Sequence, residues 1–160
     1  MFKNRILYFI AILLINMMLI SDIRSGQATD AEYYEFSAEV DKSLPFSEAV
    51  RVGNLLFLSG QVGNIPGTMD LVPGGIQAET RQTMENIKAV LEKRGSSLAE
   101  VVKCTVFLAD ISEWSSLNEV YIEYFPVKRP ARSALGVNGL ALGARTEIEC
   151  IATLTKTGRG

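Results

Sequence analysis

The stretch 128-KRPARSALGVNGLALGARTEIECIATLT-155 carries the most informative pattern in this sequence, two strand-like runs on either side of a glycine-rich loop. Residues 131–137 and 146–155 predict strands, and the second run alternates polar with apolar side chains. The glycines between the runs predict a hairpin loop. Arg132 lies near the start of the first strand and Glu147 near the start of the second. In a hairpin, we expect these two side chains to face one pocket.

The rest of the chain predicts further strands and two helices. Strands are expected at residues 31–40, 45–52, 55–58 and 101–109, and helices at residues 76–94 and 110–124. The first helix has its apolar stripe at Ile76, Thr80, Met84, Ile87 and Leu91, and the second at Trp114, Leu117, Tyr121 and Tyr124. Asp110 is the expected N-cap of the second helix, and Glu113 follows at the spacing of a capping box.

This order of elements predicts an α+β fold, with one mixed β-sheet and two helices packed on one face of it. The other face of the sheet also carries apolar residues, because Phe57 alternates with Leu58 and Phe107 with Leu108. Burial of that face against copies of the same chain predicts a homo-oligomer.

Composition excludes several kinds of site. The chain has 160 residues, which is the length of one domain, and it contains no histidine. Without histidine, neither a Ser-His nor a Cys-His nucleophile nor a His-ligated metal can form. Two cysteines are too few for a cysteine-rich zinc site. We therefore expect no metal.

The N-terminal residues have the pattern of a secretory signal peptide. Lys3 and Arg5 precede an apolar run at residues 6–20, and small residues follow near Ala28. We expect a signal peptide at residues 1–28 and a folded domain at residues 29–160. The protein would then be exported, periplasmic or secreted. The alternative is an uncleaved leader that acts as a membrane anchor.

Charge argues against a nucleic-acid partner. Residues 29–160 contain 13 basic and 17 acidic residues, a net charge of −4. Binding to phosphates requires local positive charge, so we expect no nucleic acid and, after leader cleavage, no membrane contact.

The two cysteines alternate with apolar residues on predicted strands. Cys104 and Cys150 are therefore interpreted as small buried hydrophobic residues. The alternative is a disulfide, which export would permit if the two strands were neighbours.

Four segments have a motif content that is specific to one family. They are 45-PFSEAVRVGNLLFLSGQVG-63, 80-TRQTMENIKAVLE-92, 101-VVKCTVFLADISEWSSLNEVY-121 and 129-RPARSALGV-137 with 147-EIECIA-152. In this order they resemble the RidA/YjgF family of imine deaminases, formerly called the endoribonuclease L-PSP family. The resemblance implies a chorismate-mutase-like homotrimer with ligand clefts between subunits. It also implies hydrolysis of reactive 2-imino or enamino acids to 2-oxo acids and ammonia, without a metal or organic cofactor.

The resemblance also assigns roles to residues. Arg132 would grip a substrate carboxylate, and Glu147 would position the attacking water. Gly60 matches the backbone that approaches the ligand, and Asn118 matches another pocket position. Other interpretations remain open: Arg132 could pair with Glu147 or Glu149, and Asn118 could be an ordinary surface residue.

Two positions depart from the family pattern. Phe46 stands where the family usually has tyrosine, and Ala134 stands where it commonly has cysteine. Both belong to the expected substrate-binding residues, so a different imine or carboxylate could be bound. Two other functions therefore remain open: a non-catalytic trimeric protein that binds small carboxylates, and a ribonuclease.

Overall fold

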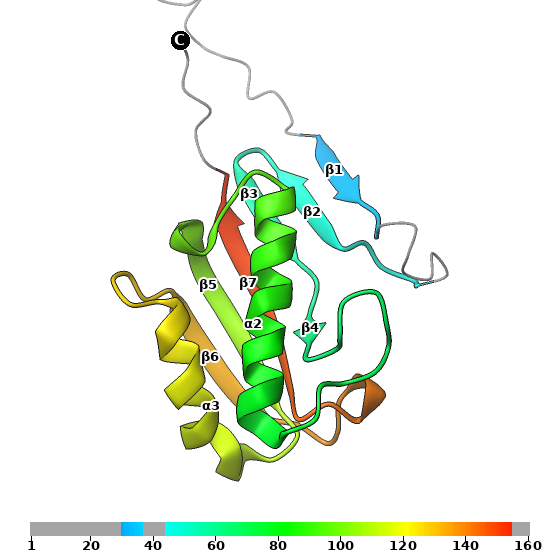
Figure 1. Ribbon diagram of the computed structural model, residues 1–160. Coiled ribbons are helices and arrows are strands. Elements are labelled where there is room, and N and C mark those ends of the chain that lie inside the picture. Colours follow the sequence, from blue (N-terminus) through cyan, green and yellow to red (C-terminus); the bar gives the residue numbers. More distant parts are fainter. Residues whose placement is uncertain (1–29, 37–43, 155–160) are drawn as a thin grey trace, which may run out of the picture.

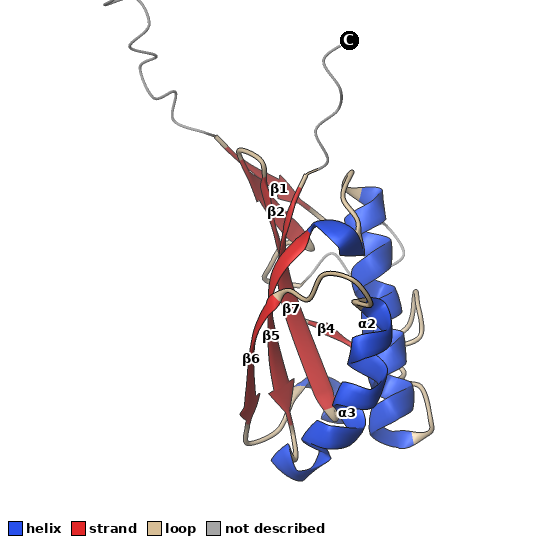
Figure 2. Cartoon of the chain, turned by 90° about the vertical axis from the view of Figure 1, so that its left-hand side faces the viewer, coloured by secondary structure: helices blue, strands red, loops and turns tan. Residues whose placement is uncertain are grey.

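The computed structural model describes residues 30–36 and 44–154. They form two layers, a mixed sheet and two helices that cover one of its faces (Figures 1 and 2). The strands are β1 (Ala31–Tyr34), β2 (Ala49–Val52), β3 (Leu55–Leu58), β4 (Gln61–Val62), β5 (Val101–Leu108), β6 (Ala131–Gly136) and β7 (Thr146–Thr153). The helices are α2 (Gly75–Lys93) and α3 (Trp114–Tyr121), with short 3-10 turns at Leu98–Glu100, Ile111–Glu113, Ile122–Tyr124 and Ala141–Gly143.

The sheet has the strand order β1-β2-β3-β7-β5-β6, and β4 also pairs with β7. The β5–β6 pair is parallel, and the other pairs are antiparallel. The predicted fold class, a mixed sheet with both helices on one face, is confirmed. Strand β4 was not predicted, because two residues are too short to show a period of two.

The β2–β3 hairpin is confirmed. Gly53 adopts a φ of 61° in its turn, which a residue with a Cβ adopts only at a cost. Strand β1 is the edge strand predicted at residues 31–40, although residues 37–40 lie outside the described part. The predicted signal peptide at residues 1–28 also lies outside it. Among the described helices, none has the length and apolar character to cross a membrane.

Helix α2 follows the prediction to within one residue at each end. Every member of its predicted stripe is buried against the sheet. The stripe includes Thr80, and Thr83 is buried beside it. Their hydroxyls donate to the carbonyls of Ile76 and Glu79, at 2.7 Å and 2.8 Å. The two hydroxyls therefore lie in the core without a lost hydrogen bond.

The start of the second helix differs from the prediction. Asp110 caps the 3-10 turn before α3, where its carboxylate accepts from the Ser112 N–H at 2.9 Å. Glu113 does not complete a capping box, because its carboxylate forms an ion pair with Arg145. Asp110 and Glu113 have the spacing of a capping box, but the Glu113 carboxylate pairs with Arg145, which is distant in the sequence, instead of with the local backbone N–H.

Strands β6 and β7 do not form the predicted hairpin. Strand β5 lies between them and pairs with β6 on one side and β7 on the other. Helix α3 connects β5 to a parallel β6, so the C-terminal ends of both strands lie at the same edge of the sheet. The loop 137–145 then passes over the end of β5, where the Val137 N–H donates to the Leu108 carbonyl.

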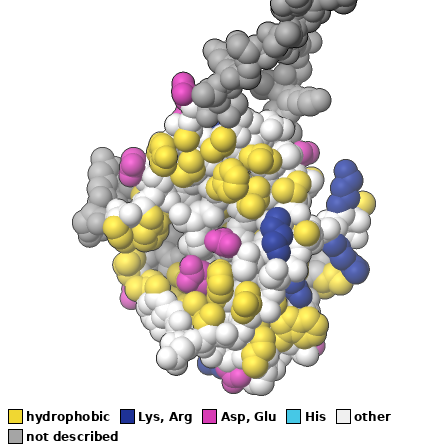
Figure 3. Space-filling model, turned by 180° about the vertical axis from the view of Figure 1, so that it is seen from behind, with side chains coloured by type: hydrophobic (Ala, Val, Ile, Leu, Met, Phe, Trp, Pro, Cys, Tyr) yellow, Lys and Arg dark blue, Asp and Glu magenta, His cyan; other side chains and the backbone are white. Residues whose placement is uncertain are grey.

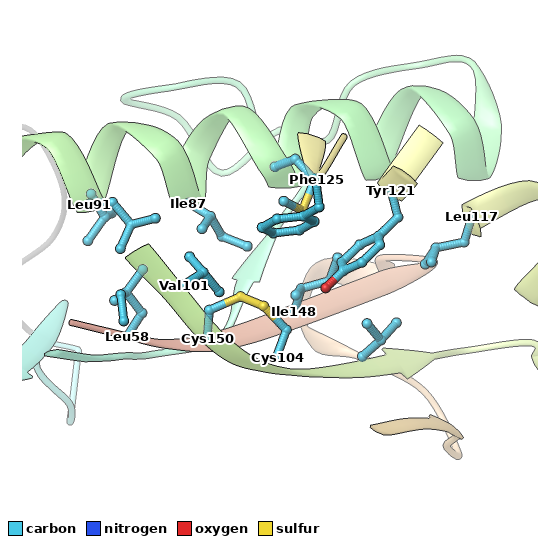
Figure 4. Packing of buried hydrophobic residues seen from close by; sticks show 14 of the residues in the cluster. Leu58, Ile87, Leu91, Val101, Cys104, Leu117, Tyr121, Phe125, Ile148 and Cys150 are labelled. Carbon is cyan, nitrogen blue, oxygen red and sulfur yellow. A yellow bond between two sulfur atoms is a disulfide. The ribbon is translucent and has the colours of Figure 1, made fainter. Parts of the chain in front are cut away.

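The core fills the space between the sheet and the helices. Its fully buried members include Leu56, Met84, Ile87, Leu91 and Leu117. Figure 4 shows the side chains of α2 and α3 meeting those of the sheet in this layer. The opposite face of the sheet, away from the helices, carries some of the candidate site residues described below.

The interpretation of both cysteines as buried residues is confirmed, and the disulfide, which was the alternative, is present. Cys104 of β5 and Cys150 of β7 lie directly opposite each other and form a disulfide. Both side chains are buried, and the bond lies between the sheet and the helices (Figure 4). The sequence showed that both residues share the apolar faces of their strands, but not that β5 and β7 are neighbours.

Candidate active site

Arg132 lies on β6 with its side chain on the helix-covered face of the sheet. It stands opposite Cys104 in the β5–β6 register, and Cys104 belongs to the core. The guanidinium lies over the ring of Tyr121 at 4.7 Å and over the ring of Trp114 at 5.8 Å. Within the described residues it forms no salt bridge. The proposed ion pair with Glu147 or Glu149 is therefore absent from this part of the chain, and the charge is available for a ligand.

A groove of about 390 Å³ surrounds this guanidinium. Its lining residues come from α3, the turn after it and the start of β6: Trp114, Asn118, Tyr121, Ile122, Phe125, Arg129, Pro130 and Arg132. Asn118 is half-buried in the groove, so it is not an ordinary surface residue. The structure thus places Asn118 and Arg132 together, as the sequence predicted.

Tyr121 is a buried side chain next to Arg132. Its hydroxyl points toward the sheet beside Ile148 and has no hydrogen-bond partner among the described residues (Figure 4). Burial raises the pKa of Tyr121 to about 12, although the positive charge of Arg132 opposes the shift. Tyr121 therefore stays protonated at neutral pH and cannot serve as a base there.

Glu147 lies on β7 opposite Phe107, and both point away from the helices. Its carboxylate lies against Gly60, and a Cβ at that position would collide with it. Burial raises the pKa of the Glu147 carboxyl above its ordinary value, and the negative charge of Glu149 raises it further. A carboxylate of this kind is suited to accept a proton from water.

Phe46 belongs on the side of Gly60 rather than on the side of Arg132. The Ser59 hydroxyl donates to the Ser47 carbonyl at 2.7 Å, which holds the segment of Phe46 beside the residue before Gly60. The Phe46 ring is 48% exposed and meets the Phe36 ring edge to face at 5.7 Å. An apolar pair therefore stands where the resemblance led us to expect a tyrosine hydroxyl.

Ala134 lies two residues after Arg132 on the same face of β6. It stands opposite Val106 and packs against the core. It does not line the groove. Ala134 was expected among the substrate-binding residues. In the structure it packs against the core, on the strand that carries Arg132, and does not reach the groove.

The predicted residues form two groups on opposite faces of the sheet. The arginine group consists of Arg132, Asn118, Trp114 and Tyr121, on the face that the helices cover. The glutamate group consists of Glu147 and Gly60, on the other face, with Phe46 nearby. The expectation that Arg132 and Glu147 share a pocket within one hairpin is wrong. Strand β5 separates β6 from β7, and the two side chains point to opposite faces of the sheet.

Sequence reasoning missed the aromatic residues that hold the arginine. Trp114 and Tyr121 were interpreted only as the apolar stripe of a helix, yet both also contact the guanidinium. The structure shows the difference, because Trp114 is 44% exposed at a stripe position, but the sequence carries no signal of that exposure. Among the described residues, no cluster of cysteine, aspartate and glutamate has the arrangement of a metal site.

Comparisons with known proteins agree with this fold. The family model described as Endoribonuclease L-PSP matches residues 36–154. A RutC family protein of Pyrococcus horikoshii is 47% identical over 108 residues, which are 68% of this chain and 86% of that protein. A Bos taurus protein named 2-iminobutanoate/2-iminopropanoate deaminase is 45% identical over 108 residues, 68% of this chain and 79% of its own.

Solved structures give the same assignment. RidA from the Antarctic bacterium Psychrobacter has a TM-score of 0.67 and 38% identity, covering 80% of this chain and 99% of its own. YyfA from Yersinia pestis, described as a member of the conserved Rid protein family, has a TM-score of 0.72 and 37% identity, covering 78% and 100%. The chain therefore belongs to the Endoribonuclease L-PSP family, which includes the RidA and Rid proteins.

Proposed function

We propose that this protein hydrolyses reactive 2-imino acids to 2-oxo acids and ammonia. The observation that carries the proposal is the environment of Arg132. Its guanidinium lies over two aromatic rings in a groove, and it forms no salt bridge with a carboxylate among the described residues. A planar guanidinium binds a carboxylate through two parallel hydrogen bonds. The deaminase names of the bovine and other relatives support the same reaction class.

The chemistry requires little beyond orientation and a base. Arg132 binds the carboxylate and thereby fixes the imine carbon. Glu147 accepts a proton from water as the water oxygen bonds to that carbon. This proton passes to the nitrogen, so the intermediate carries a hydroxyl and an amino group on one carbon. The remaining hydroxyl proton then moves to the nitrogen as the carbon–nitrogen bond breaks, ammonia leaves and the carbonyl forms. Water supplies the oxygen, and no electrons are gained or lost, so no redox cofactor is required.

We further infer that the reacting site lies in clefts between copies of the chain, assembled as a homotrimer. Arg132 and Glu147 project from opposite faces of one sheet, so one chain cannot bring both to one substrate. A second copy can, if its glutamate group meets the arginine group of the first. Figure 3 views the face away from the helices, where hydrophobic side chains surround acidic ones. Phe57 and Leu135 are exposed large hydrophobic residues on that face.

The test is a coupled assay. An L-amino-acid oxidase generates 2-iminopropanoate from alanine, and the decay of the imine is followed by trapping with semicarbazide. We expect the protein to accelerate the decay. Arg132→Ala and Glu147→Gln should each reduce the acceleration by about 100-fold or more, because each removes a group that orients or activates the reactants.

Arg51→Ala is the matched control. Arg51 lies on β2, at the far end of the sheet order from β6, and its ion pair with Glu32 is exposed. This variant should retain the activity of the wild type. No acceleration by the wild-type protein, or an unchanged rate in Arg132→Ala, would remove the proposed activity.

A non-catalytic carboxylate-binding protein is the second candidate, and the loss of polar groups at Phe46 and Ala134 favours it. It predicts that pyruvate raises the melting temperature while the deaminase assay stays blank. Ribonuclease activity, the third possibility, would need an acid–base system other than histidine, since the chain has none. RNA added at low salt without cleavage would exclude it.

We also infer that the protein is exported. The leader pattern at residues 1–28 and the disulfide between Cys104 and Cys150 both agree with an oxidising compartment. Expression of the full chain in a bacterium, followed by fractionation and N-terminal sequencing, tests this. A mature protein that begins near residue 29 outside the cytoplasm is expected. An intact chain in the cytoplasm would contradict export, and an intact chain in the membrane would indicate an uncleaved anchor.

A further inference from the structure

The groove around Arg132 is larger than a small imino acid requires. Its volume of about 390 Å³ falls within the range of roughly 300–1,000 Å³ that is typical of pockets for drug-sized ligands. This is the volume on one chain, before the glutamate group of a second copy is brought against it, and a three-carbon imino acid bound to Arg132 through its carboxylate would not fill it. The unfilled part of the groove is therefore available to a substrate side chain.

The walls of that space are apolar. Apart from Asn118 and the two arginines, the lining consists of aromatic or aliphatic residues: Trp114, Tyr121, Ile122, Phe125 and Pro130. Among residues 30–36 and 44–154, no acidic residue lines the groove. Trp114 is 44% exposed and Ile122 is 45% exposed, so two large hydrophobic surfaces face the opening. An apolar ligand group in the groove would remove this surface from water.

The position of Arg132 indicates how such a ligand is oriented. The guanidinium of Arg132 stacks on Tyr121 and Trp114, which fixes the carboxylate end of the ligand beside those rings. The remainder of the ligand then lies against the apolar lining, which includes Ile122. Arg129, which is exposed, also borders the groove. It is the one lining residue that could prefer a second carboxylate on the ligand.

We propose that the preferred substrates are 2-imino acids with a large apolar or aromatic side chain, which the groove between α3 and the start of β6 accommodates. This inference rests on the proposed function, because it assigns the substrate class of the same site. The reaction that supplies such substrates is the two-electron oxidation of an apolar α-amino acid at its amine-bearing carbon, in which a separate flavin-dependent oxidase accepts the hydride and passes the electrons to O2. The products are the corresponding branched or aromatic 2-oxo acids and ammonia.

The experiment compares imines that an L-amino-acid oxidase generates from alanine, leucine, phenylalanine and aspartate. We expect kcat/KM for the phenylalanine and leucine imines to exceed that for the alanine imine by about tenfold or more, since each added methylene in an apolar pocket contributes a factor of this order. Equal values, or a preference for alanine, would overturn the proposal. A preference for aspartate would also overturn it and would assign Arg129 to a second carboxylate.

Ile122→Ala locates the preference in the groove. Ile122 lines the groove and is 45% exposed, and such a position tolerates truncation. The ratio of kcat/KM for the phenylalanine imine to that for the alanine imine should fall several-fold in this variant. Ile111→Ala is the control, because Ile111 is equally exposed but does not line the groove. An unchanged ratio in Ile122→Ala would overturn the assignment of the groove.

A binding experiment separates this inference from the proposed function. Calorimetric titration with phenylpyruvate, pyruvate and oxaloacetate measures the groove without turnover. Tighter binding of phenylpyruvate than of the other two, with no deaminase activity, would overturn the proposed function but support the groove. Equal or absent binding of all three would overturn the groove, whatever the assay shows.

Discussion

Arg132 is prepared for a ligand by aromatic rings rather than by a carboxylate. Its planar guanidinium stacks on Tyr121 and Trp114, which a compact ammonium group cannot do in the same way. We therefore predict that Arg132→Lys, although it keeps the charge, weakens the binding of pyruvate by about tenfold. Calorimetric titration measures the change, and Arg51→Lys is the matched control. Equal binding in Arg132→Lys would mean that charge alone holds the ligand.

Glu147 should set the acid limb of the pH–rate profile. As a base it must be deprotonated, so activity is lost as the pH falls through its pKa. That pKa lies above the ordinary value of 4.5, because burial raises it and the charge of Glu149 adds to the shift. Removing the charge in Glu149→Gln lowers the pKa of Glu147. We predict that the acid limb of kcat/KM moves to lower pH in this variant.

The control for this shift is Glu92→Gln. Glu92 is an exposed carboxylate on α2, on the helix side of the sheet, whereas Glu147 points away from it. Its removal changes the net charge by the same amount and should leave the acid limb in place. An acid limb that stays fixed in Glu149→Gln, or that moves to higher pH, contradicts the assignment of Glu147 as the base.

Gly60 is required by the position of the Glu147 carboxylate. A Cβ at residue 60 would occupy the space that this carboxylate fills. We predict that Gly60→Ala displaces the carboxylate and lowers kcat by about 10- to 100-fold, because a misplacement of about 1 Å is enough for such a loss. The binding of pyruvate, which depends on Arg132, should persist. Full activity in Gly60→Ala would show that the carboxylate can act from another position.

Strands β5 and β7 are joined by the disulfide as well as by their hydrogen bonds. The bond closes a loop across a sequence separation of 46 residues. Chain-entropy arguments give such a cross-link about 2–4 kcal/mol of stabilisation. We predict that protein unfolded, reduced and refolded in a reductant has a free energy of unfolding lower by this amount. Denaturant titrations of the oxidised and reduced forms measure the difference.

The reduced wild type is the appropriate comparison because it keeps both sulfur atoms in the core. A Cys104→Ala/Cys150→Ala variant would also lose packing volume, so its stability should be lower still and insensitive to reductant. Identical denaturation midpoints for the oxidised and reduced wild type would show that the disulfide does not stabilise the fold.

The whole assembly is tested by mixing two inactive variants. Arg132→Ala keeps an intact glutamate group, and Glu147→Gln keeps an intact arginine group. If each cleft takes one group from each of two neighbouring copies, trimers reassembled from an equal mixture should recover about a quarter of the wild-type activity. Activity of the mixture after unfolding and refolding together, compared with each variant refolded alone, measures the recovery.

Recovery requires that no single chain contain a complete site. A mixture that stays inactive would contradict the shared cleft, provided that analytical ultracentrifugation shows mixed oligomers. A protein that remains monomeric in that experiment would contradict the homotrimer as well. The opposite placement of Arg132 and Glu147 would then need another explanation.

The separate residues of the site were accessible to sequence reasoning, but their relation was not. Arg132 and Glu147 were identified from the motifs that contain them, and Asn118 from its place on the second helix. The predicted hairpin failed because nothing between residues 137 and 145 indicates which strand the loop passes over. The disulfide stayed an alternative for the same reason, since the pairing of β5 with β7 was not apparent from the sequence.

Periodicity, turn residues and capping residues act between neighbours in the chain, and for this reason the sequence specified where most helices and strands form and which sides of them are apolar. The neighbours of each strand depend on contacts between distant segments, which compete only in the folded chain. The insertion of β5 between β6 and β7 is such an outcome. It joins Cys104 to Cys150, and it places the guanidinium of Arg132 and the carboxylate of Glu147 on opposite sides of one sheet.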